Sequence, residues 1–122
     1  MATVRYLVTD VERSVAFYTK ALGFKVEQSM APAFARVSRN DLTLWLAGPQ
    51  SSAARPMPDG RRPEPGGWNR FVVETVDLVS LVAEMNRAGM RFRNDVVTGP
   101  GGKQILLEDP DGNVVELFEA AL

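Results

Sequence analysis

Apolar and polar positions along the chain follow an order that begins with a strand and a helix. Residues 3–9 alternate in the manner of a strand. Asp10 then has the position of an N-cap, and the helical spacing that follows ends at Leu22, just before Gly23. The sequence therefore predicts a helix at this point, followed by three further strands at 24–28, 34–38 and 42–47.

The same order restarts in the second half of the chain. Residues 69–75 form a predicted strand, Asp77 is the N-cap of a predicted helix, and Gly89 ends that helix. Its apolar residues recur at helical spacing: Leu78, Leu81, Val82 and Met85. Predicted strands follow at 91–97, 104–108 and 114–118. The two halves form a weak internal repeat of a βαβββ unit, and units this small are expected to pair across a shared core.

Residues 48–67 join the two halves and differ from them in composition. The stretch GPQSSAARPMPDGRRPEPGG holds five prolines, four glycines and three arginines, with almost no apolar residue. This is typical of a surface linker. A lid over a pocket is the alternative, and the linker interpretation is favoured. We therefore predict one domain, 1–122, made of a first module (1–47), a linker (48–67) and a second module (68–122).

Composition excludes several classes of function. Hydrophobic residues are 45% and charged residues 24% of 122, as in ordinary globular domains, and a net charge of −1 gives no basic field for nucleic acid. No apolar run is long enough to cross a membrane and the N-terminus lacks a signal segment, so a cytoplasmic protein is expected. The absence of cysteine and histidine excludes thiolate metal sites and every Ser-His or Cys-His nucleophile pair.

The stretch DPDGNVVELFE, residues 109–119, combines a polar turn with an apolar strand that contains one carboxylate, Glu116. Together with VTDVERSVAFYTKALGF, residues 8–24, it resembles the motifs of the glyoxalase/bleomycin-resistance/dioxygenase proteins, the vicinal oxygen chelate (VOC) superfamily. The resemblance spans essentially the whole chain. It implies an α+β fold in which two βαβββ modules pair their curved mixed sheets into a cleft for a small molecule. It also implies that a homodimer forms.

Metal-using members of that superfamily hold a divalent ion with four inward-pointing side chains. Carried over one position at a time, the last ligand position falls on Glu116, which is intact. The other three fall on Thr3, Trp45 and Arg70, and a cationic guanidinium repels a metal ion. We therefore expect no cofactor; a divalent metal remains possible, although three of the four positions do not support it.

Arg70 is the expected partner of Glu116, because a guanidinium forks onto a carboxylate through two hydrogen bonds. A purely structural salt bridge is the equal alternative. Arg5 shares the strand face of Thr3 and is expected to add a second positive group. The tryptophans are expected to form an aromatic wall or, alternatively, to serve in packing. The full set of predicted ligand-binding residues is Arg5, Trp45, Trp68, Asn69, Arg70, Gln104 and Glu116.

Three hypotheses about function remain open. The first is a metal-free protein that binds a small anionic or polarised organic molecule in an arginine-lined cleft. The second is a superfamily enzyme (a lyase, isomerase or dioxygenase-like protein) with a rebuilt site, in which Arg70 stabilises an enolate and Glu116 acts as the base. The third is a regulatory module without a ligand of its own.

Overall fold

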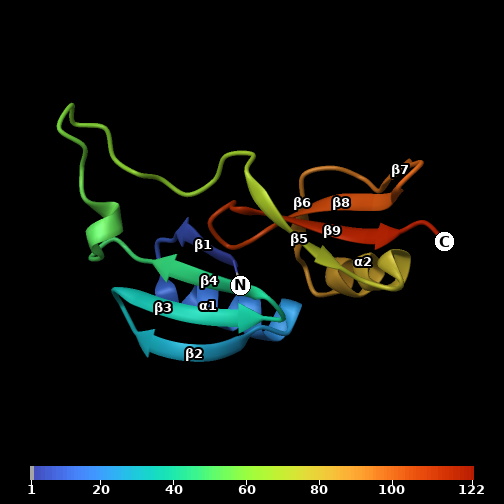
Figure 1. Cartoon of the computed structure of the whole chain (residues 1–122), viewed down its shortest axis with the longest axis horizontal. Helices are drawn as coiled ribbons and strands as arrows, with labels where there is room; N and C mark the ends of the chain where they lie inside the picture. The colour runs from blue at the N-terminus through green and yellow to red at the C-terminus, as the bar shows by residue number, and fades with distance from the viewer. Residues whose placement is uncertain (1) are drawn as a thin grey trace. The chain divides into compact units, whose positions relative to one another are not determined.

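The computed structural model describes residues 2–122, and the chain divides into two compact units after Pro65 (Figure 1). Each unit contains one α-helix and one mixed sheet, so the fold class is α+β as predicted. The predicted βαβ order is found in both halves. Within the described residues, neither helix is long and apolar enough to cross a membrane.

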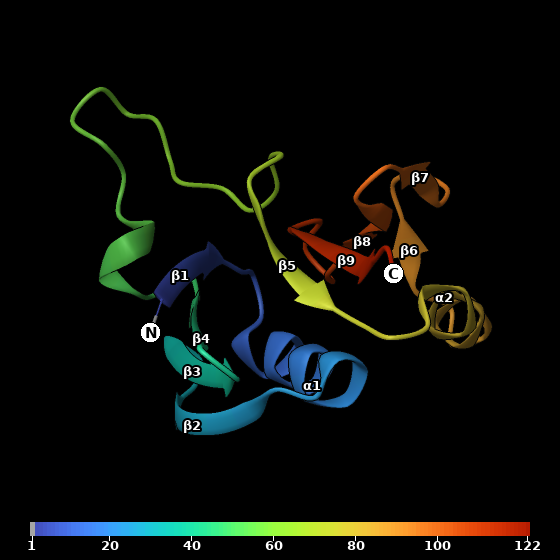
Figure 2. The same cartoon turned by 45° about the vertical axis from the view of Figure 1, so that its right-hand side comes forward.

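The first unit forms a four-stranded sheet with one helix against it. Its elements are β1 (Ala2–Leu7), α1 (Val11–Leu22), β2 (Lys25–Met30), β3 (Phe34–Arg39) and β4 (Leu42–Ala47). The strand order is β1-β4-β3-β2; β1 runs parallel to β4, and the other pairs are antiparallel. Figure 2 shows α1 lying along this sheet, in agreement with its contacts to β3 and β4.

Helix α1 begins and ends where the sequence predicts. The side chain of Asp10 accepts a hydrogen bond from the backbone N–H of Arg13, and Gly23 ends the helix with a φ of 71°, a left-handed conformation that glycine adopts without strain. The buried side of the helix includes Tyr18, which has no exposed surface and meets the ring of Phe24 edge to face. These contacts anchor the helix on the sheet.

The two faces of this sheet differ because side chains alternate along each strand. On β3 and β4 the residues with no exposed surface are Ala35, Val37, Leu44 and Leu46, and α1 packs against these strands. The residues between them point to the opposite, open face, which includes Arg36 on β3 and Trp45 on β4. The open face of this sheet therefore carries side chains that could contact a ligand.

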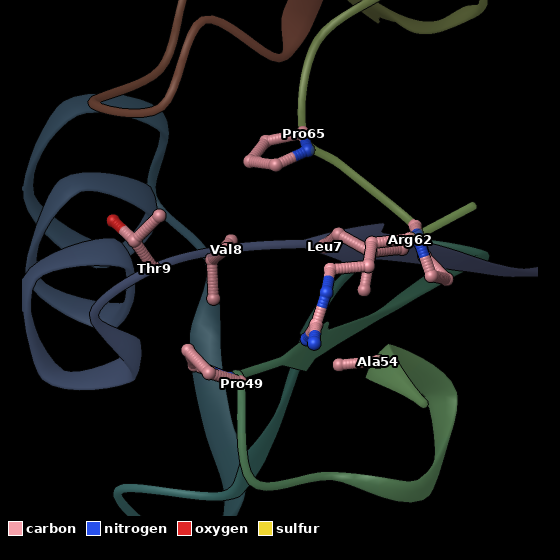
Figure 3. Close-up of a pocket in the computed structure, with 8 residues that line it drawn as sticks. Leu7, Val8, Thr9, Pro49, Ala54, Arg62 and Pro65 are labelled. Carbon is pink, nitrogen blue, oxygen red and sulfur yellow. The ribbon is translucent and has the colours of Figure 1, made fainter. Parts of the chain in front are cut away.

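The linker contains a single short 3-10 helix, η1 (Ser52–Ala54), and a turn in which Arg61 pairs with Asp59. Part of the linker lies against the end of β1 and encloses a pocket of about 160 Å³. Figure 3 shows this pocket and the side chain of Arg62, which extends from the linker toward Ala54. The segment is therefore partly packed against the first unit rather than hanging free along its whole length.

The second unit repeats the arrangement with a five-stranded sheet. Its elements are β5 (Arg70–Glu74), α2 (Leu78–Arg87), β6 (Arg91–Phe92), β7 (Val97–Gly99), β8 (Gly102–Glu108) and β9 (Val114–Ala120). The strand order is β5-β9-β8-β6, with β7 also paired to β8, and β5 runs parallel to β9. Strand β9 is thus flanked on both sides.

Helix α2 has two acids at its N-terminus. Asp77 accepts a hydrogen bond from the N–H of Ser80, and the carboxylate of Glu119, at the end of β9, accepts one from the N–H of Leu78 at 2.8 Å. Gly89, with a φ of 79°, follows the last turn. Asp77 and Gly89 were both predicted, whereas the contribution of Glu119 depends on the tertiary fold and was not.

The predicted continuous strand at 91–97 is wrong. The structure has only β6 and β7 there, with an irregular stretch at 93–96 between them. The side-chain oxygen of Asn94 accepts a hydrogen bond from the N–H of Leu106 on β8. In a regular sheet, a backbone carbonyl of the neighbouring strand would accept that hydrogen bond. A polar side chain has therefore replaced the strand ladder at this point.

Candidate functional site

Glu116 lies in the middle of β9 on the open face of the second sheet. Its register neighbours are Val72 on β5 and Leu106 on β8. The residue is 9% exposed, so its carboxylate is largely removed from water. A carboxylate in such a position requires a compensating partner.

Arg70, at the start of β5, is that partner. Its Nε and Nη2 lie 3.1 and 3.0 Å from the same oxygen of Glu116, Oε1, and its Nη1 donates to the carbonyl of Trp68 at 3.4 Å. The predicted ion pair is therefore confirmed, with both donors on one oxygen rather than one on each. Among residues 2–122, no hydrogen bond to the second oxygen of Glu116 is found.

A shallow pocket of about 390 Å³ lies beside this ion pair. It is lined by Val72, Glu74, Glu116 and Phe118, from the adjacent strands β5 and β9. Gln104 lies on the same face, because it is opposite Phe118 in the β8–β9 register. Three of the predicted residues, Arg70, Gln104 and Glu116, therefore share one face of the second sheet.

The other two predicted residues of the second unit lie just before its first strand, β5. Trp68 is 68% exposed and Asn69 is exposed, and both directly precede β5. The ring of Trp68 is covered by the guanidinium of Arg93, whose Cζ is 4.5 Å from the ring centroid. Trp68 therefore stacks on a cation within its own unit.

In the first unit, Arg5 and Trp45 are direct neighbours on the open face. They are opposite each other in the parallel β1–β4 register, and Cζ of Arg5 lies 4.9 Å from the centroid of the Trp45 ring. Thr3 is on the same face of β1, two residues earlier. The ring of Trp45 also meets Phe34 edge to face at 5.8 Å, which fixes its orientation.

Two side-chain contacts near the candidate residues were not predicted from the sequence. Arg36 approaches Trp45 from the side of β3, with Cζ 5.1 Å from the ring centroid. The indole that was predicted either to form part of an aromatic wall or to serve in packing therefore contacts two guanidinium groups. The alternating pattern of residues 34–38 placed Arg36 on this face and was the signal available in the sequence.

Arg93 is the second contact that was not predicted, because the sequence indicated only that it lies in a strand at 91–97. Its guanidinium binds Glu108 at 2.9 Å and the carbonyls of Gly67 and Gly112 at 2.6 and 2.8 Å. Its side chain is only 17% exposed. Arg93 thus joins the start of the second unit to the turn before β9, beneath Trp68, and no local sequence signal distinguishes such a residue from a surface arginine.

Comparison with known proteins gives the same assignment as the fold. The sequence model of the Glyoxalase/Bleomycin resistance protein/Dioxygenase superfamily matches residues 1–117. The chain belongs to this superfamily. No curated protein sequence matches it at a significant level.

Solved structures of the superfamily fold resemble the whole chain. A superfamily member from Sphaerobacter thermophilus is 26% identical with a TM-score of 0.75, over 98% of this chain and 95% of that one. A lactoylglutathione lyase from Agrobacterium tumefaciens is 18% identical (TM-score 0.74; 98% and 92% covered). TnmS3, an antibiotic binding protein from a Streptomyces species, is 23% identical (TM-score 0.71; 98% and 93% covered). One fold thus accommodates both an enzyme and a binding protein.

The residues at the superfamily's metal-ligand positions do not fit a divalent ion. In the second unit, Nε of Arg70 donates a hydrogen bond to Oε1 of Glu116 and Nη2 forms an ion pair with the same oxygen, so the guanidinium places a positive charge beside this carboxylate that repels a metal ion. In the first unit, the indole of Trp45 offers no lone pair, and Thr3 offers only a hydroxyl. Among residues 2–122, no group of three or more acidic, cysteine or histidine side chains is placed to hold an ion.

Proposed function

We propose that this superfamily member binds a small organic anion through arginines on its open sheet faces, without a divalent metal. The observation that carries the proposal is the placement of Arg5. Its guanidinium lies over the ring of Trp45, and no carboxylate pairs with it among residues 2–122. Stacking on an indole orients the planar guanidinium and leaves its N–H edge available to a carboxylate or phosphate.

The Arg70–Glu116 pair supports metal independence. Electrostatically, the guanidinium supplies beside Glu116 the positive charge that an ion supplies in the metal-using members. The predicted ligand residues Trp68, Asn69 and Gln104 add one aromatic ring and two amides near this pair.

The test uses the fluorescence of Trp45. The chain has two tryptophans, so the Trp68→Phe variant reports on Trp45 alone. After dialysis against a chelator, it is titrated with small aromatic and aliphatic carboxylates, phosphonates and sulfonates. We expect saturable binding of some of these anions, weakened at least tenfold by Arg5→Gln and unchanged by Arg87→Gln, a matched change in the last turn of α2. Binding that requires an added divalent metal, or no binding of any anion, would overturn the proposal.

A second candidate function is an enzyme that abstracts a proton next to a carbonyl group. The observation in its favour is that Glu116 borders the 390 Å³ pocket and donors among residues 2–122 occupy only one of its oxygens. The other oxygen would act as the base, and Arg70 would stabilise the resulting enolate. The test follows the loss of C–H signals from a bound carbonyl acid in D2O. Exchange that Glu116→Gln abolishes and Glu84→Gln preserves supports catalysis, whereas a ligand that binds without exchange supports a pure binding protein.

We further propose that the chain acts as a homodimer. Superfamily members are often dimers, and all six residues of the edge strand β2 are exposed in the single chain. An exposed edge strand is commonly covered by a partner. Sedimentation equilibrium at micromolar concentration should give twice the 13.4 kDa chain mass; a single-chain mass there would contradict this proposal.

A further inference from the structure

Three side chains form a row across the open face of the first sheet. Arg5 on β1 is opposite Trp45 on β4, which is opposite Arg36 on β3. Both guanidinium groups lie within cation–π distance of the ring, with Cζ at 4.9 and 5.1 Å from its centroid. Because β1 and β3 lie on opposite sides of β4, the two cations approach the indole from opposite sides.

The row carries two positive charges without a compensating acid. No ion pair or side-chain hydrogen bond is found for Arg5 or Arg36 among residues 2–122. The one acid on the adjacent strand β2 is Glu27, and it is already bound by Lys25 at 3.2 Å and Ser38 at 3.1 Å. The next residue of β2 in the row, Gln28, is uncharged.

The two guanidinium groups on either side of Trp45 repel each other, and the indole between them offsets this only in part through its electron-rich faces. Phe34 holds the arrangement in place, because its ring meets Trp45 edge to face and lies 5.8 Å from Cζ of Arg36. The row is therefore a pair of exposed cations whose repulsion falls when two negative charges bind to it.

From this we infer the class of ligand, an inference that rests on the proposed function. We propose that the row binds a small organic dianion, with one acidic group on Arg5, the other on Arg36, and the carbon skeleton across the exposed edge of Trp45. Each guanidinium presents two parallel N–H groups, which fit a carboxylate or phosphonate. A monoanion satisfies only one of the two cations. Arg36 is then the residue that separates dianions from monoanions.

The test compares matched probes at constant ionic strength. The Trp68→Phe protein is titrated with the dicarboxylates succinate, glutarate and adipate and with butyrate, pentanoate and hexanoate, and Trp45 fluorescence is followed. We expect at least one dicarboxylate to bind at least tenfold more tightly than its monocarboxylate counterpart. Arg36→Gln should remove this preference while monocarboxylate binding persists through Arg5.

Arg39→Gln is the control, because Arg39 is on the same strand but on its other face, and it should leave the preference intact. The far-ultraviolet circular dichroism of each variant establishes that it is folded, and Arg36→Lys, which retains the charge, provides a second variant with an intermediate preference. Equal binding of the paired probes, or a preference that survives Arg36→Gln, overturns the dianion assignment and leaves anion binding intact. Absence of binding by every probe overturns both.

Discussion

Arg70 directs two N–H groups at a single oxygen of Glu116, and the two side chains differ in their access to water. The carboxylate side chain is 12% exposed and the guanidinium 31%. Loss of the arginine would therefore leave a largely buried negative charge, whereas loss of the acid would leave a cation that can still reach solvent. Such asymmetry predicts that the two single substitutions differ in their cost.

Replacing Arg70 by alanine should lower the free energy of unfolding by about 1–3 kcal/mol, less than for a fully buried pair because part of the guanidinium is in water. Adding Glu116→Gln to that variant should restore part of the loss, because the neutral amide tolerates burial. Urea denaturation of the wild type, both single variants and the double variant measures this coupling, with Arg87→Ala as the surface control. Unchanged stability in Arg70→Ala would contradict the energetic importance of the pair, and unchanged anion binding would favour the purely structural interpretation.

Ser14 is a second residue with a clear energetic consequence. It lies in α1 with no exposed surface, and among residues 2–122 its hydroxyl group has no hydrogen-bond partner. Ser14→Ala should raise the free energy of unfolding by about 1 kcal/mol, because it removes an unsatisfied buried polar group and adds a better helix former. Thermal denaturation checks this. Ser80→Ala is the contrast and should destabilise, since that hydroxyl donates to Asp77 at 2.8 Å.

At the scale of the elements, local sequence signals correctly predicted features that depend on neighbouring residues, such as where each helix begins and ends. Both helices begin at the predicted aspartates and are followed by the predicted glycines, because capping and helix termination depend on neighbouring residues. The strands of the first half agree with prediction to within a few residues, because the alternation of apolar and polar residues is also a local signal. The Arg70–Glu116 pair was also predicted, from the lone acid in an apolar strand.

The features that could not be predicted from the sequence depend on contacts between different elements of the fold. Residues 91–97 look like a strand, but Arg93 binds the carbonyls of Gly67 and Gly112, and Asn94 binds β8. These partners lie 12 to 26 residues away, so their convergence exists only after folding. The stacking of Arg36 on Trp45 likewise depends on the β3–β4 register.

The position of Arg93 predicts an effect of a conservative substitution. Arg93→Lys keeps the charge, but one ammonium group cannot reach Glu108, two carbonyls and the Trp68 ring together. We expect a loss of about 2 kcal/mol of stability, from the hydrogen bonds left unmade at a largely buried side chain. Chemical denaturation measures it, and Trp68 fluorescence should shift as its ring loses the stacked cation. The same change at Arg87 should do neither.

The N-terminus of α2 should respond to acid. The hydroxyl and N–H of Ser80 hydrogen-bond to Asp77 and hold the pKa of this carboxyl below its usual value. A pKa that is lower in the folded state gives stability above the ordinary pKa of aspartate, and that stability is lost as the pH falls through the folded value. The melting temperature of the wild type should therefore exceed that of Asp77→Asn at pH 7 and converge with it at low pH.

At the scale of the whole molecule, the two repeated units share a topology and differ in the charge of their open faces. The first presents two uncompensated arginines beside Trp45, whereas the second holds its arginine in an ion pair and adds Glu74 to the pocket lining. The ligand chemistry proposed above therefore resides mainly in the first unit. In the second unit the ion pair places a positive charge directly beside Glu116.

Metal content is the corresponding prediction for the whole protein. After incubation with nickel, manganese, zinc and ferrous iron and extensive dialysis, elemental analysis should find no stoichiometric ion, because three of the four superfamily ligand positions carry unsuitable side chains. Glu116→Ala should leave this result unchanged. An ion bound at one per chain in the wild type and lost in Glu116→Ala would contradict the proposal and favour the enzyme.

The fork of Arg70 on Glu116 also bears on how this chain would evolve. A lineage that acquired a metal centre at the superfamily's ligand positions would have to replace Arg70 as well as Thr3 and Trp45. The first such step, at Arg70, frees a buried carboxylate before enough ligands exist to attract an ion, so it reduces fitness through stability without any gain in affinity. Acquisition of a metal at this position therefore requires compensating stability elsewhere in the second unit before an ion can bind.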